Sequence, residues 1–221
     1  SEEESEDDAH DLSSRSAEQV PFAQPASNGQ PQPTLARAGT TMAGGAGVRS
    51  LDGIDGAPFK IIVIGDSGVG KTCLLLRFTE GRYDGLQKAT VSVDISNAVL
   101  DLGSGSTVGL SLWDTAGQER FAPLSAPYFR QADGVMIVFD VGRRSSFERV
   151  ITYWQDELFF KGDPDASIML IGSKADVPEN ERMVSDAEAQ ALADEHGWLY
   201  FATSAKSGVH VRDAFYLLAC T

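Results

Sequence analysis

The chain is poor in cysteine and in basic residues, and it has no long apolar run. Two of its 221 residues are cysteine and no CxxC or zinc-binding pattern occurs, so the sequence favours a reducing cytosol over a disulfide scaffold. Lys and Arg number 18 against 32 Asp and Glu, and the net charge of −14 argues against binding to nucleic acid or docking on anionic lipid. No apolar stretch approaches the roughly 18 residues that span a bilayer. We expect no signal peptide, because the N-terminus has neither a basic nor an apolar segment.

Composition divides the chain near Pro58. Residues 1–57 open with SEEESEDD, continue through segments rich in Pro, Gly, Ala and polar residues, and contain few large apolar residues. Such a segment cannot bury enough apolar surface to offset the entropy lost on ordering, so we expect residues 1–57 to be a disordered acidic extension. Its role is open between a passive solubiliser, which the composition favours, and a regulatory partner. Residues 58–221 are expected to form one folded domain.

From residue 58 the sequence alternates between short apolar runs and helical segments. Runs such as VMIVFD and SIMLIG are apolar throughout, as strands covered on both faces are. The alternation predicts an α/β fold with a six-stranded, mostly parallel sheet flanked by helices, and GSGS at 103–106 predicts a hairpin. Two helices carry capping boxes, Ser145…Glu148 and Ser185…Glu188. The expected strands are 59–64, 91–102, 110–114, 135–141, 168–172 and 199–203, and the expected helices are 71–78, 118–129, 146–160, 186–196 and 211–220.

The most specific motif is GDSGVGKT at 65–72, between a strand-like run and a helix. Its spacing, G-x-x-x-x-G-K-[ST], is that of the Walker A phosphate-binding loop. The glycines let successive backbone N–H groups surround phosphate oxygens, and the helix start adds its positive dipole. Lys71 is placed to reach β- and γ-phosphates, and the Thr72 hydroxyl to occupy a position on octahedral Mg²⁺. The expected nucleotide contacts in this loop are Asp66, Ser67, Gly68, Val69, Gly70, Lys71, Thr72 and Cys73.

Residues 113–120, WDTAGQER, follow a strand-like segment and carry three groups suited to phosphate chemistry. Asp114 at a strand end suits Mg²⁺, which takes oxygen ligands and keeps several waters. Gly117 lets a backbone N–H approach a γ-phosphate, because no Cβ stands in the way. Gln118 carries a donor and an acceptor on one amide, which suits the orientation of an attacking water.

Two later segments select the base. In SKAD at 173–176, the Asp176 carboxylate can accept two hydrogen bonds from adjacent N–H groups, which guanine offers and adenine does not, and the Lys174 stem can lie along the base. In TSAK at 203–206, the Ala205 N–H could donate to the guanine 6-oxygen. These segments leave an ATP-dependent kinase or transport ATPase as the poorly supported alternative. The expected base contacts are Ser173, Lys174, Asp176, Ser204, Ala205 and Lys206.

With these motifs in this order, residues 58–221 resemble a small GTPase of the Ras superfamily, and most of all its Rab branch. The segments that carry the resemblance are WDTAGQERF, YFRQA at 128–132, IVFDV at 137–141 and TVSVDI at 90–95. The resemblance implies a P-loop NTPase G domain that binds GTP or GDP with Mg²⁺. It implies that Thr90 joins Thr72 and Asp114 as a Mg²⁺ ligand, touching the γ-phosphate only in the GTP state. It also implies that Tyr83 packs edge-on against guanine, and that the catalytic residues are Lys71, Thr90, Gly117 and Gln118.

The resemblance further implies an exchange factor, a GTPase-activating protein and effectors that contact Thr90 to Ile95 and Trp113 to Tyr128. No arginine lies in an obvious cis-finger position, so we expect an activator to supply one in trans.

The sequence departs from the Rab pattern at the base-binding segment and at the switch segment. Ser173 stands where the family has Asn, and so lacks the amide that ties the base loop to the phosphate loop. Ser92 and Ile95 replace Gly and Phe, so the hydrophobic triad of Ile95, Trp113 and Tyr128 matches the Rab form at two of three positions.

The expected function is a monomeric switch that binds and hydrolyses GTP and regulates vesicle and membrane trafficking. The alternative is a nucleotide-dependent interaction module with little turnover, which Ser173, the altered switch segment and the missing lipid tail favour. The sequence ends LACT, with neither a C-a-a-X ending nor a cysteine pair. We therefore expect a cytoplasmic protein that is peripheral on endomembranes only if a lipidated tail exists beyond Thr221.

Overall fold

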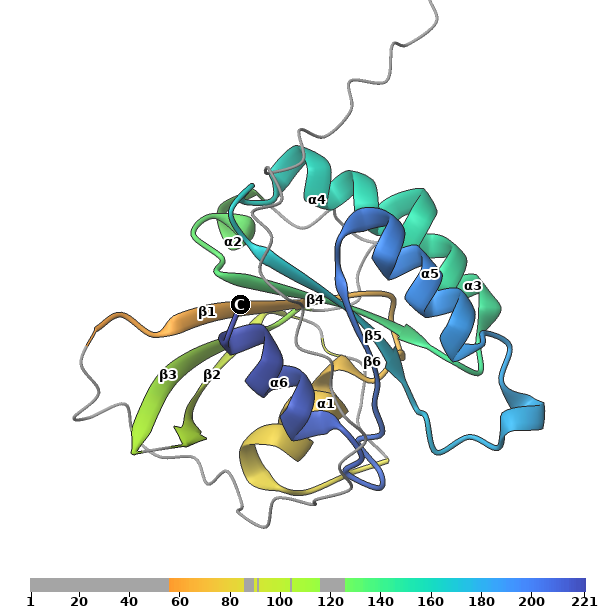
Figure 1. The fold of residues 1–221 in the computed structure, drawn as a ribbon, viewed down its shortest axis with the longest axis horizontal. Coiled ribbons are helices and arrows are strands. Elements are labelled where there is room, and N and C mark those ends of the chain that lie inside the picture. Colours follow the sequence, from red (N-terminus) through yellow and green to blue (C-terminus); the bar gives the residue numbers. More distant parts are fainter. Residues whose placement is uncertain (1–55, 86–89, 91, 104, 116–125) are drawn as a thin grey trace, which may run out of the picture. The chain divides into compact units, whose positions relative to one another are not determined.

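The computed structural model describes residues 56–85, 90, 92–103, 105–115 and 126–221 (Figure 1). All of them belong to one compact unit, Ala43–Thr221. The expected disorder of residues 1–57 concerns a segment that lies, apart from its last two residues, outside the described part.

Six strands form one sheet in the order β2-β3-β1-β4-β5-β6. Neighbouring strands are parallel except for β2 and β3, which are antiparallel. The predicted six-stranded, mostly parallel sheet is therefore confirmed, and the carboxyl ends of its parallel strands meet at one edge. The bounds are β1 Phe59–Ile64, β2 Asp94–Gly103, β3 Ser106–Asp114, β4 Gly134–Asp140, β5 Ser167–Ser173 and β6 Leu199–Ala202.

The GSGS hairpin is also confirmed, since Gly103 pairs with Ser106 at the end of β2 and β3. The register shifts between Asp101 and Gly103, where the Asp101 carboxylate accepts the Gly103 N–H at 2.8 Å. Strand β2 begins at Asp94 instead of at residue 91.

The helices expected at 71–78, 186–196 and 211–220 are present with bounds within two residues of the prediction. Of the helix expected over 118–129, residues 118–125 lie outside the described part and 126–129 form α2. The prediction differs from the structure between residues 144 and 161, where one helix was expected over 146–160. The chain there forms α3, then a π-helical turn, then α4, and the Gln155 N–H donates to the Val150 carbonyl five residues back. Among the described residues, no helix is long and apolar enough to cross a bilayer. The bounds are α1 Lys71–Glu80, α2 Ala126–Phe129, α3 Arg144–Arg149, η1 Val150–Trp154, α4 Gln155–Lys161, η2 Glu179–Glu181, α5 Asp186–His196 and α6 Val211–Ala219.

Of the two predicted capping boxes, the N-cap at Ser185 is confirmed and the box at Ser145 is wrong. The Ser185 hydroxyl accepts the Glu188 N–H at 3.2 Å at the start of α5. Helix α3 instead begins at Arg144, with no side-chain cap. The neighbouring Ser146 takes the polar role there, because its hydroxyl donates to the Arg143 carbonyl at 2.7 Å and accepts the Asp140 N–H at 3.0 Å.

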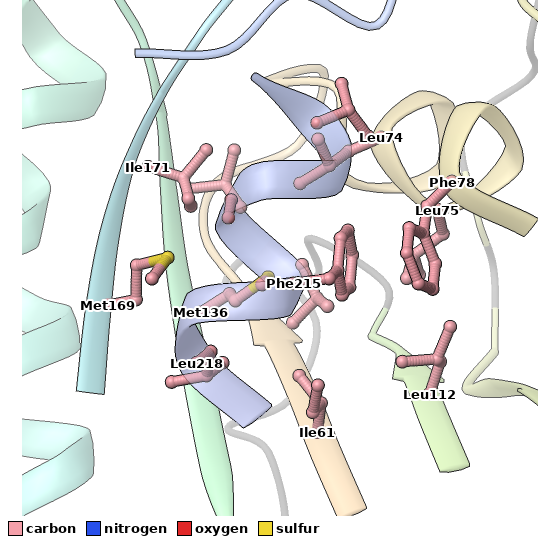
Figure 2. Packing of buried hydrophobic residues seen from close by; sticks show 14 of the residues in the cluster. Ile61, Leu74, Leu75, Phe78, Leu112, Met136, Met169, Ile171, Phe215 and Leu218 are labelled. Carbon is pink, nitrogen blue, oxygen red and sulfur yellow. The ribbon is translucent and has the colours of Figure 1, made fainter. Parts of the chain in front are cut away.

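Helices cover the sheet on both faces, and each face has its own apolar core (Figure 1). Ile61 and Val63 of β1 point into the core beneath α1 and α6, while Ile62 and Ile64 point into the core beneath α3, η1, α4 and α5. This division follows from the two-residue period of a strand. In the first core, Phe78 of α1 stacks on Phe215 of α6 with ring centroids 4.0 Å apart (Figure 2).

Candidate nucleotide site

The phosphate loop runs from the end of β1 to the start of α1. Gly65, Gly68 and Gly70 all have positive φ, and a Cβ on Gly65 would clash with the Val138 carbonyl of β4. Only glycine satisfies both requirements at position 65. Lys71 is 5 % exposed, and its Nζ lies 2.7 Å from the Gly65 carbonyl oxygen and 2.9 Å from that of Asp66. The lysine therefore holds the two ends of the loop together and places a positive charge inside it.

Three oxygen-bearing side chains from separate segments meet beside this loop. The Thr72 hydroxyl donates to the Asp114 carboxylate at 2.6 Å, and Thr90 Oγ1 lies 2.8 Å from Thr72 Oγ1. Thr72 is the second residue of α1, Asp114 ends β3, and Thr90 lies in the connection before β2. The sequence predicted all three as metal ligands, and the structure brings them together.

The donor set suits Mg²⁺. The second carboxylate oxygen of Asp114 is buried and has no hydrogen-bond partner among the described residues, which leaves it available to a cation. Burial raises the pKa of Asp114, against the lowering effects of the Thr72 hydrogen bond and the Lys71 charge. A hard cation at one carboxylate and two hydroxyls would keep several waters, as Mg²⁺ does. No group of three or more His, Cys, Asp or Glu that could hold a metal occurs in the described ranges, so any metal here depends on the hydroxyls.

The predicted base contacts meet where the segments after β5 and β6 come together. The Asp176 carboxylate accepts the Ser204 hydroxyl at 2.6 Å and lies 3.6 Å from Lys206 Nζ. Burial favours a higher pKa for Asp176, but the Ser204 hydrogen bond and then the Asp176 backbone and Lys206 outweigh it and lower the pKa. The carboxylate is thus held ionised and oriented. The Ala175 N–H donates to the Thr203 carbonyl at 2.9 Å and ties the two loops to each other.

Ser173 links the base loop to the phosphate loop. Its hydroxyl lies 2.5 Å from the Val69 carbonyl oxygen and 2.7 Å from that of Phe139, and the residue is 5 % exposed. Ser173 lacks the amide of the family's Asn, but its hydroxyl makes the contact with the phosphate-loop backbone directly. A hydroxyl reaches Val69 because the end of β5 lies close enough for a short side chain. The next residue, Lys174, has φ of 60° and pairs with Asp140 of β4 at 2.6 Å.

The remaining predicted residues lie at the rim or outside the described ranges. Tyr83 is 43 % exposed in the segment after α1. Burial, and then the Asp84 charge, raise the pKa of the Cys73 thiol, whose Sγ lies 3.6 Å from the Asp84 carbonyl. Trp113 and Tyr128 make an edge-to-face contact at 6.1 Å, and the exposed Ile95 pairs in register with Trp113. The catalytic candidates Gly117 and Gln118 lie outside the described residues.

Comparison with known proteins agrees with this arrangement of loops. The family model described as the Ras family matches residues 60–221, which is most of the chain. The chain belongs to the Ras family. This Ras-family chain is 41 % identical over 160 residues to "Ras-related protein RAB1BV" of Beta vulgaris, covering 72 % of this chain and 74 % of that protein. It is 41 % identical over 193 residues to "Ras-related protein Rab-26" of Bos taurus, covering 87 % and 70 %. It is 41 % identical over 163 residues to "GTP-binding protein yptV2" of Volvox carteri, covering 74 % of each. The predicted Rab branch is confirmed.

Several residues of this Ras-family site were missed by the sequence analysis because no motif contains them. Arg77 of α1 donates through Nε to the Ala205 carbonyl at 2.5 Å and through Nη2 to the Lys206 carbonyl at 3.0 Å. Arg143, which precedes α3, donates to the Ser67 carbonyl of the phosphate loop at 3.0 Å. Arg149 and Trp154, which lie near and in the π turn, donate to the Asp66 carboxylate. Each contact joins residues more than 70 positions apart, and no local pattern signals such a pair.

Proposed function

We propose that this Ras-family chain is a Rab-type switch that binds GTP, hydrolyses it to GDP and phosphate, and regulates vesicle trafficking. The observation that carries the proposal is the meeting of Thr72, Thr90 and Asp114 beside a glycine-rich loop whose lysine points inward. The Asp176 carboxylate, held by Ser204 at 2.6 Å, supports guanine as the base. The names of the relatives, among them a GTP-binding protein and Ras-related Rab proteins, agree with this choice.

The chemistry is a displacement at the γ-phosphorus. A water oxygen bonds to phosphorus as the bond to the bridging oxygen breaks, and the products are GDP and inorganic phosphate. Backbone N–H groups of the phosphate loop and the Lys71 ammonium offset the negative charge that gathers on the β-phosphate side. Bound Mg²⁺, held by Thr72, Thr90 and, directly or through a water, by Asp114, would neutralise part of the phosphate charge. Gln118 orients the attacking water in this proposal.

The position of Thr90 explains how the GTP-bound and GDP-bound states would differ. GTP offers a γ-phosphate that can hold the segment around Thr90, and hydrolysis removes that contact. Ile95, Trp113 and Tyr128 then form the face that effectors, an exchange factor and an activating protein would read. Ile95 is 51 % exposed and lies beside Trp113 on the hairpin. Because Ile95 follows Thr90 closely in the sequence, a movement of the segment around Thr90 would alter this face. We place the switch in the cytoplasm, peripheral on endomembranes only if a lipidated tail exists beyond Thr221.

Nucleotide binding and single-turnover hydrolysis test the proposal. We expect fluorescent GDP and GTP to bind in the presence of Mg²⁺, with GTP and not ATP as the effective competitor. We expect wild type to convert bound GTP to GDP slowly, and Gln118→Leu to retain binding while hydrolysis falls. Preference for ATP would contradict the base assignment. Tight GTP binding without turnover, even with candidate activating proteins, would favour the interaction module instead.

A further inference from the structure

Asp66 is the one acidic residue in the phosphate loop GDSGVGKT, and its carboxylate is turned toward η1. Its Oδ1 accepts the Arg149 Nε–H at 2.8 Å and the Trp154 indole N–H at 3.0 Å. Asp66 is 8 % exposed and Trp154 is 1 % exposed. A negative charge in a loop built for phosphates is unfavourable unless it is neutralised, and the Arg149 guanidinium is the positive partner that the structure gives it.

The π-helical turn explains how both donors reach one oxygen. Arg149 and Trp154 are five positions apart. In an α-helix, with about 3.6 residues per turn, such positions point to different sides. In the turn Val150–Trp154 the hydrogen bond runs from Gln155 back to Val150, which brings residues five apart onto a common side. The Arg149 guanidinium also lies over the Tyr153 ring, 4.8 Å from its centroid, and this contact fixes it further.

The same residue touches the phosphate-facing lysine. The Asp66 carbonyl oxygen lies 2.9 Å from Lys71 Nζ, while its side chain is held by Arg149 and Trp154. A movement of Asp66 therefore shifts an acceptor that holds the lysine. The path from Arg149 to Lys71 passes through one residue and consists of hydrogen bonds at both steps.

We infer that Arg149 is a positioning residue for the terminal phosphates, made possible by the π turn at η1. It neutralises and orients Asp66, and through the Asp66 backbone it keeps Lys71 placed for the β- and γ-phosphates. The inference rests on the proposed function, because it takes the ligand to be a guanine nucleotide. An uncompensated Asp66 carboxylate repels GTP more than GDP, since GTP carries the additional phosphate charge.

The test compares GTP and GDP dissociation constants of wild type, Arg149→Gln, Arg149→Lys and the double variant Asp66→Asn, Arg149→Gln. We expect Arg149→Gln to weaken GTP binding by about tenfold, as one uncompensated charge near the phosphates would. GDP binding should weaken less, and the loss of GTP binding should shrink as salt is raised. Arg149→Lys should recover part of the loss, because it restores the charge. Adding Asp66→Asn should also recover part of it, because it removes the charge that needed a partner.

Arg144→Gln is the matched control. It removes the same charge five residues earlier, where the guanidinium pairs with Glu188 at 2.6 Å and Glu148 at 3.4 Å instead of with the phosphate loop. Its nucleotide affinities should equal those of wild type. Wild-type affinities in Arg149→Gln, an equal loss for GTP and GDP with a lowered melting temperature, or no recovery in the double variant would each overturn the inference. Failure of wild type itself to bind either nucleotide would overturn the proposed function, and the inference with it.

Discussion

The Thr72 hydroxyl lies 2.8 Å from the Thr90 hydroxyl, although the two residues are 18 positions apart. Thr72 is fixed in the first turn of α1, whereas Thr90 belongs to the connection that leads to β2. The contact brings this connection against the Asp114 carboxylate, which Thr72 also contacts. The proposed metal site therefore has two of its ligands on regular elements and one on a connecting segment, and we expect hydrolysis of GTP to release the last of these.

Thr90→Ala should weaken Mg²⁺-dependent GTP retention and leave GDP retention nearly unchanged. The reason is that GTP alone offers the γ-phosphate that holds Thr90 in the proposed switch. We expect the Mg²⁺ concentration that gives half of the maximal slowing of GTP release to rise about tenfold, which corresponds to about 1.4 kcal/mol in metal binding. The measurement is fluorescent-nucleotide release during Mg²⁺ titration, with the exposed Thr107→Ala of β3 as control. An equal change for both nucleotides would contradict this role.

Asp176→Asn should remove the preference for guanine and favour a base with a carbonyl where guanine has its amino group. The amide can donate where the carboxylate only accepts, so the hydrogen-bond pattern is reversed at that edge. Competition between guanosine and xanthosine triphosphates for the site measures the change. Asp165→Asn, in the exposed turn before β5, is the charge-matched control. Unchanged selectivity would mean that Asp176 does not read the base.

Ser173→Ala should speed the release of GDP and GTP by the same factor. The hydroxyl that reaches the Val69 carbonyl is lost, and a net hydrogen bond of about 0.5–1.5 kcal/mol corresponds to about a two- to tenfold change. The contact is made to the loop backbone, so it should not discriminate between the two nucleotides. Ser173→Asn should release both nucleotides no faster than wild type, because its amide can make the same contact. A loss confined to GTP would show that Ser173 acts on the γ-phosphate.

Arg77→Ala should weaken the binding of guanine nucleotides without affecting hydrolysis of bound GTP. Its guanidinium holds the carbonyls of Ala205 and Lys206, so its loss frees the loop that presents the Ala205 N–H. We expect nucleotide release to accelerate about tenfold, as for the loss of one charge-assisted hydrogen bond of about 1.5 kcal/mol. Arg82→Ala removes the same side chain from the segment after α1, where it pairs with Glu80, and should release nucleotide as wild type does. A slower hydrolysis step in Arg77→Ala would contradict a role limited to the base.

The parts of this structure that follow from local pattern were predictable. Apolar strands buried on both faces, the GSGS hairpin and the glycine-rich loop each depend on residues within about ten positions of one another. The misassigned cap at Ser145 shows the limit, because Ser145 fits the pattern and Ser146 has the acceptor within reach. The π turn was not predictable, since no local pattern marks it and the contact it allows is with the distant Asp66 carboxylate. Arg77 and Arg143 lie in no motif, and their contacts depend on how the loops meet in space.

The turn after β4 joins the two halves of the nucleotide site. Arg143 at one end of this turn bonds to Ser67 of the phosphate loop, and Asp140 at the other end pairs with Lys174 of the base loop. Residues that share partners in this way do not contribute independent free energies. We therefore expect the affinity for a complete nucleotide to differ from what free phosphate and free nucleoside would suggest separately. Double-mutant cycles that combine one change in each loop should therefore give a non-zero coupling energy. The affinity of a base analogue should also change when the phosphate loop is altered.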